Sequence, residues 1–269
     1  MTTATITVQH RSSGLRGAIA SEWTKLWTVR SSWLNLVAAV LLTGLLALQF
    51  GFSIAYDHEN LAPEEVPARL PELSAVGGVA VSAMTIVQVV VAALAMLLVT
   101  SEYATGSIRS TLQWTPVRRN VVLAKAVVLA PVLFLYGLLL GVVASIVGGL
   151  AMGQWADWDL ATLVVDLLAV AAYTTLAGVF TAGIAFIIRS TAGTLTAAFL
   201  LLIVVPMMLS QSSIRALVWL AALLPGGAGQ NFLAGSTDTL SPTLSFLVLI
   251  AWAAAGLLAG TTILNRRDA

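Results

Sequence analysis

The sequence contains no cysteine, and only two of its 269 residues are lysines and two are histidines. Without cysteine, the protein has no disulfide bond, no thiolate metal site and no cysteine nucleophile. Both histidines, His10 and His58, lie outside the long apolar runs, so a histidine-based protease or metal site inside those runs would have no ligands. We therefore expect no catalytic residue and no metal site on this chain.

Charged residues are scarce as well. They make up 9% of the chain, whereas soluble domains carry roughly 25%. Hydrophobic residues make up 59%, and the mean hydropathy is +0.96. This composition predicts an integral membrane protein whose main surroundings are the lipid bilayer, and no nucleic-acid partner is expected.

Six apolar segments reach the ~20 residues that a helix needs to cross a bilayer. We therefore predict an all-α fold, with residues 1–14 as a disordered cytoplasmic tail and residues 15–269 as a single transmembrane domain. A seventh apolar stretch ends at Pro225, Gly226 and Gly227 and is too short to cross, so residues 215–238 are expected to form a short re-entrant or interfacial helix on the outer side. The predicted spans are residues 31–56, 73–101, 126–156, 160–188, 190–214 and 239–265.

Residues 15–30 have a helical pattern that precedes the first span. One side carries Trp23, Leu26 and Trp27 and the other carries Glu22 and Lys25. This pattern predicts an amphipathic helix in the membrane interface with its tryptophans turned toward lipid. The alternative is an ordinary cytoplasmic extension of the first span.

Basic residues are concentrated in every second connection between the predicted spans. If the N-terminus is cytoplasmic, eleven of the thirteen lysines and arginines face the cytoplasm, and only Arg69 and Arg215 lie outside. Cytoplasmic loops are enriched in basic residues, so this bias places both termini in the cytoplasm. An even number of spans agrees with that orientation.

The connection at residues 102–125 is the densest polar stretch between two apolar runs. It begins with Glu102 and Tyr103, breaks at Gly106, and carries Arg109 and Arg118 around a possible short helix. We expect this cytoplasmic loop to receive force from a soluble partner. Alternatively, its basic residues only satisfy the charge bias and contact lipid phosphates.

Neither lysine belongs to a nucleotide-binding motif. A P-loop requires glycine directly before its lysine, whereas Thr24 precedes Lys25 and Ala124 precedes Lys125. No soluble stretch is long enough for a nucleotide-binding domain. We therefore expect no cofactor on this chain, and any ATP would be bound by another polypeptide.

Asp166 is the one acidic residue inside a predicted span. An ionisable residue in a membrane is a functional candidate by default. It lies six residues after Leu160, or ~9 Å along a helix, which places it near the outer headgroups and weakens that default. Asp166 nevertheless supports an alternative in which the protein is an ATP-independent ion-coupled carrier or channel.

Three stretches together resemble the permease subunits of ABC transporters of the ABC-2 type. They are residues 21–26 (SEWTKL), residues 101–109 (SEYATGSIR) with Pro116, Arg118, Arg119 and Lys125, and residues 224–230 (LPGGAGQ). The resemblance covers almost the whole chain. It implies a six-helix domain in a bacterial-type plasma membrane, which pairs with a second permease copy or a paralogue above two ATPase subunits that bind ATP and Mg²⁺.

The resemblance also implies roles for individual residues. Coupling to the ATPase would involve the N-terminal helix with Glu22 and Lys25, and the loop with Glu102, Tyr103, Gly106, Arg109 and Arg118, while residues 225–227 would dip into the outer leaflet. We therefore expect an exporter of an amphipathic or hydrophobic substrate that is not itself an enzyme. A third alternative is a membrane scaffold that binds a partner through the same loop without transport.

Overall fold

The computed structural model describes residues 14–60, 75–235 and 239–266, and nearly all of them are helical. Six helical segments are long and apolar enough to cross a membrane. No strand occurs in these three ranges apart from an isolated bridge between Ala75 and Asp157. The protein is therefore an all-α, multi-pass integral membrane protein, as the composition predicts. The six segments are α2 (Arg30–Asn60), α4 (Val76–Ala104), α6 (Arg118–Met152) with the turn η1 (Gly153–Trp155), α7 (Leu160–Ile188), α8 to α9 (Thr191–Ser210) and α12 (Pro242–Arg266).

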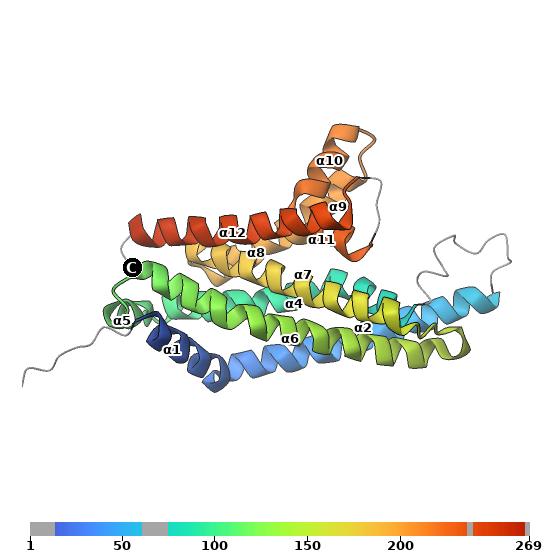
Figure 1. The fold of residues 1–269 in the computed structure, drawn as a ribbon, viewed down its shortest axis with the longest axis horizontal. Coiled ribbons are helices and arrows are strands. Elements are labelled where there is room, and N and C mark those ends of the chain that lie inside the picture. Colours follow the sequence, from blue (N-terminus) through green and yellow to red (C-terminus); the bar gives the residue numbers. More distant parts are fainter. Residues whose placement is uncertain (1–13, 61–74, 236–238, 267–269) are drawn as a thin grey trace, which may run out of the picture.

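The long helices lie side by side, with two short helices gathered at one end of the bundle (Figure 1). The short helices are α1 (Leu15–Thr28) and α5 (Ile108–Trp114), and the C-terminal end of α12 lies at the same end. Helix α7 is central and packs against α4, α6 and α12. The end that carries α1 and α5 is called the α1 end below.

Small residues bring the central helices close together. A Cβ atom added to Gly183 of α7 would lie 2.4 Å from the carbonyl carbon of Gly256 in α12, and one added to Gly137 of α6 would lie 2.8 Å from Cα of Ala171 in α7. Such contacts allow helix backbones to approach directly in a membrane. Gly137 of α6 and Gly256 of α12 therefore serve packing between helices of this chain.

The fifth span is not a regular α-helix. It consists of α8 (Thr191–Phe199), a π-helical turn η2 (Leu200–Val204) and α9 (Val205–Ser210). Proline has no N–H, so Pro206 cannot donate to the carbonyl of Leu202 four residues earlier. The sequence predicts that Pro206 disturbs this span, and the structure shows the disturbance as a π turn.

Two short helices follow, where the sequence predicts a segment that cannot cross alone. Helices α10 (Arg215–Leu223) and α11 (Pro225–Leu233) are bent by 86° at Leu224, as in a broken span or a re-entrant loop. A Cβ added to Gly226 would lie 1.9 Å from the carbonyl oxygen of Leu202. The first turn of α11 thus packs directly on the π turn. Residues 236–238 of the predicted outer segment lie outside the described residues.

Candidate functional site

Helix α1 packs on the bundle through a face that contains one charged residue. Ala18, Glu22 and Leu26 recur every four residues and are buried, whereas Trp23 and Trp27 are exposed. The amphipathic pattern separates the tryptophans from Glu22, as the structure does. However, it groups Leu26 with the tryptophans, whereas the structure buries Leu26 on the same face as Glu22, where both contact α6.

Four charged side chains from three helices meet at this place. Nζ of Lys25 lies 2.7 Å from Oε1 of Glu22 and 2.7 Å from Oε1 of Glu102 on α4. Nζ of Lys125 on α6 lies 2.6 Å from Oε2 of Glu22 and 2.8 Å from Oε1 of Glu102. These four residues are called the charge cluster below. It contains both lysines of the sequence.

The charge cluster is almost dry. The exposed fractions of Lys125, Glu22 and Glu102 are 2%, 4% and 6%. Lys125 also donates to the carbonyl of Leu98, at 2.8 Å. Two positive and two negative charges sum to zero, which is the condition under which buried ions are tolerated. Removing one partner would leave an uncompensated charge in a low-dielectric interior.

Lys25 also connects α1 to α5. Its Nζ lies 3.3 Å from Oγ1 of Thr111, and its side chain is one-third exposed. Burial disfavours the charged amine, but hydrogen bonds and Coulomb attraction from Glu102 and Glu22 outweigh this and raise the pKa of Lys25 above its ordinary value. Lys25 is therefore firmly charged at neutral pH.

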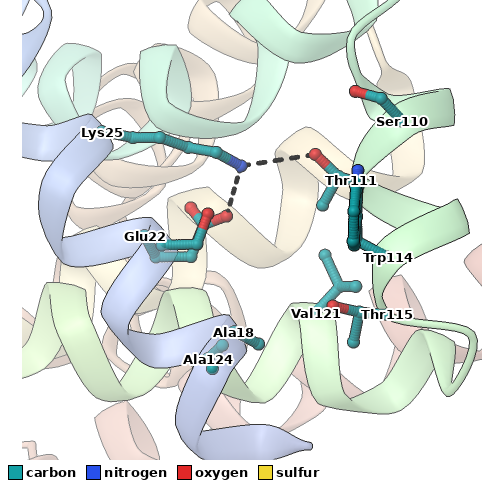
Figure 2. Close-up of a pocket in the computed structure, with 11 residues that line it drawn as sticks. Ala18, Glu22, Lys25, Ser110, Thr111, Trp114, Thr115, Val121 and Ala124 are labelled. Atoms are coloured by element: carbon teal, nitrogen blue, oxygen red, sulfur yellow. Dashed lines mark hydrogen bonds and ion pairs between the residues drawn. The ribbon is translucent and has the colours of Figure 1, made fainter. Parts of the chain in front are cut away.

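A small pocket of about 180 Å³ separates α1 from α5 (Figure 2). Lys25 and Glu22 border it from α1, and Ser110, Thr111 and Trp114 border it from α5. Trp114 is 61% exposed. The pocket is large enough for one side chain of a partner, and it lies directly beside the charge cluster.

The turn before α5 exposes a polar surface. Gly106 has φ +72°, a conformation that favours glycine, and it separates the end of α4 from α5. Buried Ile108 anchors α5 to the bundle, whereas Arg109 is exposed. Within the predicted loop, Arg109 and Gly106 are thus accessible to a partner, and Glu102 is not.

Two other predicted residues hold this end of the bundle together. The ring of Tyr103 lies under the guanidinium of Arg189, 5.2 Å from Cζ to the ring centroid, which is a cation–π contact between α4 and the end of α7. Nη1 of Arg118 donates to the carbonyl oxygens of Leu264 and Asn265, at 2.7 and 3.3 Å. Arg118 therefore caps the end of α12.

Lys125 has no predicted role. The sequence predicts it as the last residue of the loop at residues 102–125, but α6 begins seven residues earlier, at Arg118. Lys125 is therefore two turns inside a helix and buried. A signal was present: apart from Asp268 near the C-terminus, Glu22 and Glu102 are the only acidic residues on the predicted inner side, and the chain has only two lysines to match them.

The remaining predicted residues lie away from the charge cluster. Asp166 is half-buried near the start of α7, where a Cβ on Gly77 of α4 would lie 2.2 Å from its Oδ2. Pro225, Gly226 and Gly227 are buried in the first turn of α11. In the described parts of the chain, no group of three or more histidine, aspartate or glutamate residues is placed to hold a metal ion.

Comparison with protein families shows which family the chain belongs to. A family model described as "ABC-2 family transporter protein" matches residues 18–210, which extend from α1 to α9 and contain the whole charge cluster. The chain belongs to the ABC-2 family. It is therefore a transmembrane transport permease, and permeases of this family generally work with ABC ATPase subunits. No curated protein matches the sequence.

Proposed function

We propose that this ABC-2 permease is the membrane domain of an ATP-driven exporter whose energy comes from a separate ATPase. Two ATPase subunits, which bind ATP and Mg²⁺, would act on two permeases, either two copies of this chain or this chain and a paralogue. Both termini and the α1 end would face the cytoplasm of a bacterial-type cell. The carried substrate would be amphipathic or hydrophobic.

The observation that carries the proposal is the position of the charge cluster. It joins α1, α4 and α6, and Lys25 extends the contact to Thr111 of α5. Three of the four members, Glu22, Glu102 and Lys125, are buried, and moving one of them would expose the charge of another. A push on the exposed face of α5 is therefore transmitted to two membrane-spanning helices.

This geometry divides the residues around the charge cluster and α5 into two groups, which include Trp114 and Lys125 beside predicted coupling residues. Arg109 and Trp114 are exposed at the α1 end and would contact the ATPase directly. Glu22, Glu102 and Lys125 are buried and would act by positioning α1 and α5. Lys25 lies between the two groups, because it borders the pocket and also belongs to the cluster.

The apolar spans support the proposed substrate class. Within the described residues, Asp166 is the one acidic side chain more than three residues from either end of a membrane-spanning helix, and it lies six residues after the start of α7 at Leu160. A charged substrate would meet no continuous row of counter-ions along such a path. An apolar or amphipathic molecule needs none.

The test is co-purification of the permease with candidate ABC ATPase subunits, followed by ATPase assays in nanodiscs. Arg109→Glu and Trp114→Ala are expected to reduce complex formation and permease-dependent ATP turnover by about tenfold or more, without changing the melting temperature of the permease. Arg215→Glu is the matched control, since Arg215 is an exposed arginine at the start of α10. Unchanged binding in both α5 variants would contradict the proposed coupling surface.

The permease and its ATPase, reconstituted in sealed proteoliposomes, separate the alternative functions. Efflux of a lipophilic dye that requires ATP supports the exporter. Efflux that proceeds without an ATPase and stops in Asp166→Asn would instead indicate an ion-coupled carrier. A complex that hydrolyses ATP but moves no dye or lipid would favour a scaffold.

A further inference from the structure

An apolar groove of about 500 Å³ opens on the flank of the bundle, between α1, α2 and α6. Trp23 and Trp27 of α1 and Trp33 of α2 form its wall at the α1 end, and aliphatic side chains of α2 and α6 continue it. The rings of Trp27 and Trp33 lie 5.4 Å apart between centroids. These three tryptophans are called the tryptophan wall below.

Two polar side-chain atoms of the groove already have hydrogen-bond partners. Nε1 of Trp33 donates to the carbonyl of Trp27, at 3.0 Å, and the hydroxyl of Tyr136 donates to the carbonyl of Leu36, at 2.8 Å. A ligand in the groove would therefore meet an apolar lining. The stretch from Trp33 to Leu41 on α2 corresponds to ~12 Å at 1.5 Å per residue, close to the hydrocarbon depth of one leaflet, which is about half of ~30 Å.

The length and lining of the groove match a hydrocarbon chain. A lipid acyl chain in one leaflet runs along the spanning helices, so a single extended chain fits a groove of ~12 Å with an apolar lining.

A positive charge lies at the α1 end of the groove. The α2 residues that line it are Trp33, Leu36, Val37, Val40 and Leu41, which follow the helical spacing i, i+3, i+4, i+7 and i+8. Arg30 lies three residues before Trp33 and extends this stripe by one turn. It is exposed and forms no ion pair within the described part of the chain.

The groove is separate from the charge cluster. Leu26 of α1 packs against Val128 and Val132 of α6 and forms a small apolar layer between them. Helix α1 is held mainly by α6 and makes few contacts with α2. A molecule in the groove would therefore complete the contact between α1 and α2 without disturbing the ion pairs.

We propose that the groove binds one acyl chain of an anionic phospholipid from the leaflet on the α1 side, and that Arg30 pairs with the lipid phosphate. The tryptophan wall holds the chain where aromatic side chains favour the membrane interface. The arginine favours an anionic lipid, because the choline ammonium of a zwitterionic lipid offsets the charge of its phosphate, whereas nothing offsets that charge in an anionic lipid. This site does not depend on the proposed coupling to an ATPase.

The test uses the full chain in nanodiscs with acyl-brominated phosphatidylglycerol or acyl-brominated phosphatidylcholine at equal bromine content. Bromine quenches tryptophan fluorescence on contact. We expect about twofold more quenching by the anionic lipid, and loss of that difference when Trp23, Trp27 and Trp33 are replaced by phenylalanine. Arg30→Gln should abolish the difference, whereas Arg16→Gln on exposed α1 should retain it.

A second pair of variants tests the groove itself. Val37→Phe fills the groove and should abolish the headgroup preference, whereas Val164→Phe on α7 should not; the two valines have the same exposed fraction, 53%. Equal quenching by both lipids would overturn the proposal, because the groove would then hold bulk lipid without selection. No quenching of the tryptophan wall would also overturn it, because protein would then cover the groove.

Discussion

Glu22 and Lys125 lie 103 residues apart in the sequence, yet Oε2 of Glu22 and Nζ of Lys125 are 2.6 Å apart in a buried position. This contact attaches the interfacial helix α1 to the membrane-spanning helix α6. Glu102 completes the bridge from α4 and accepts from both lysines. The arrangement makes the N-terminal helix part of the same rigid unit as the two spans that flank α5.

Lys125→Met is expected to destabilise the protein strongly. It leaves Glu22 and Glu102 with Lys25 alone, so one negative charge stays buried without a partner, at a cost of about 3–5 kcal/mol in unfolding free energy. The melting temperature in detergent measures the effect. Arg109→Met, which removes an exposed charge on neighbouring α5, should change it little.

The double variant Lys125→Met with Glu102→Gln should recover much of that loss. It removes one charge of each sign and leaves the neutral pair of Glu22 and Lys25, whose Nζ and Oε1 are 2.7 Å apart. If the double variant is as unstable as the sum of the two single variants, the residues act independently and the network interpretation is wrong.

The number and approximate positions of the membrane-spanning helices could be predicted from the sequence, because a spanning helix requires a long apolar run. The start and end of α7 at Leu160 and Ile188 match the predicted span, since Asp159 caps the helix and Arg189 ends it. Helix α6 begins at Arg118, eight residues before the predicted span at residues 126–156. Hydropathy alone excludes Arg118 and Lys125 from a span, whereas their partners on α12, α1 and α4 allow both to join the helix.

The contact of Lys25 with Thr111 of α5 is longer, at 3.3 Å, than the contacts of Lys125 with Glu22 and Glu102. Lys25→Met should loosen α5, because it removes the donor to Thr111 while the contacts of Lys125 remain. Faster hydrogen exchange in residues 108–114, with no change in α7, would show this. Thr111→Val should have a similar but smaller effect, and an unchanged exchange rate in both variants would contradict a link between α1 and α5.

The pH dependence of this contact follows from the raised pKa of Lys25. A raised pKa means that the folded state binds the proton more tightly than the unfolded chain, so the contribution is fully present below the ordinary pKa of 10.5. It is lost only as the pH rises above that value. The rate of hydrogen exchange in α5 is first corrected for its intrinsic pH dependence. Between about pH 6 and 9, titration of Lys25 should then cause no change in that rate.

Gly226→Ala should destabilise the packing of α11 on the fifth span. The new Cβ would lie 1.9 Å from the carbonyl oxygen of Leu202, a backbone atom in the π turn, so the helices must move apart at a cost of about 1–3 kcal/mol. Gly44→Ala is the matched control, because its Cβ would meet nothing within 4 Å and alanine is the better helix former. A lower melting temperature for Gly44→Ala than for Gly226→Ala would refute the close approach.

The charge cluster was only partly predictable. The motif-bearing residues Glu22, Lys25 and Glu102 were selected from the sequence, but as surface contacts for a partner. Their burial depends on how α1 folds back over α6, and periodicity on a single helix contains no information about which face meets another helix. The separation of Arg109 from Glu102 into an exposed and a buried role required the structure.

Arg118→Ala is expected to loosen the C-terminal end of α12. Nη1 of Arg118 lies 2.7 Å from the carbonyl oxygen of Leu264, one of the last carbonyls of a helix, which have no partner within that helix. A positive charge at this place also interacts favourably with the helix dipole. Together these contributions correspond to about 1 kcal/mol in local opening, or roughly a fivefold faster hydrogen exchange in the last turn of α12.

Arg119→Ala is the control for this experiment, because Arg119 is the adjacent arginine on α6 and its side chain is exposed. It changes net charge by the same amount but removes no bond to α12. If both variants accelerate exchange equally, the effect comes from charge and the cap is unimportant. If only Arg118→Ala does so, the start of α6 and the end of α12 move as one unit. Force that reaches α6 at the α1 end would then also reach the last span.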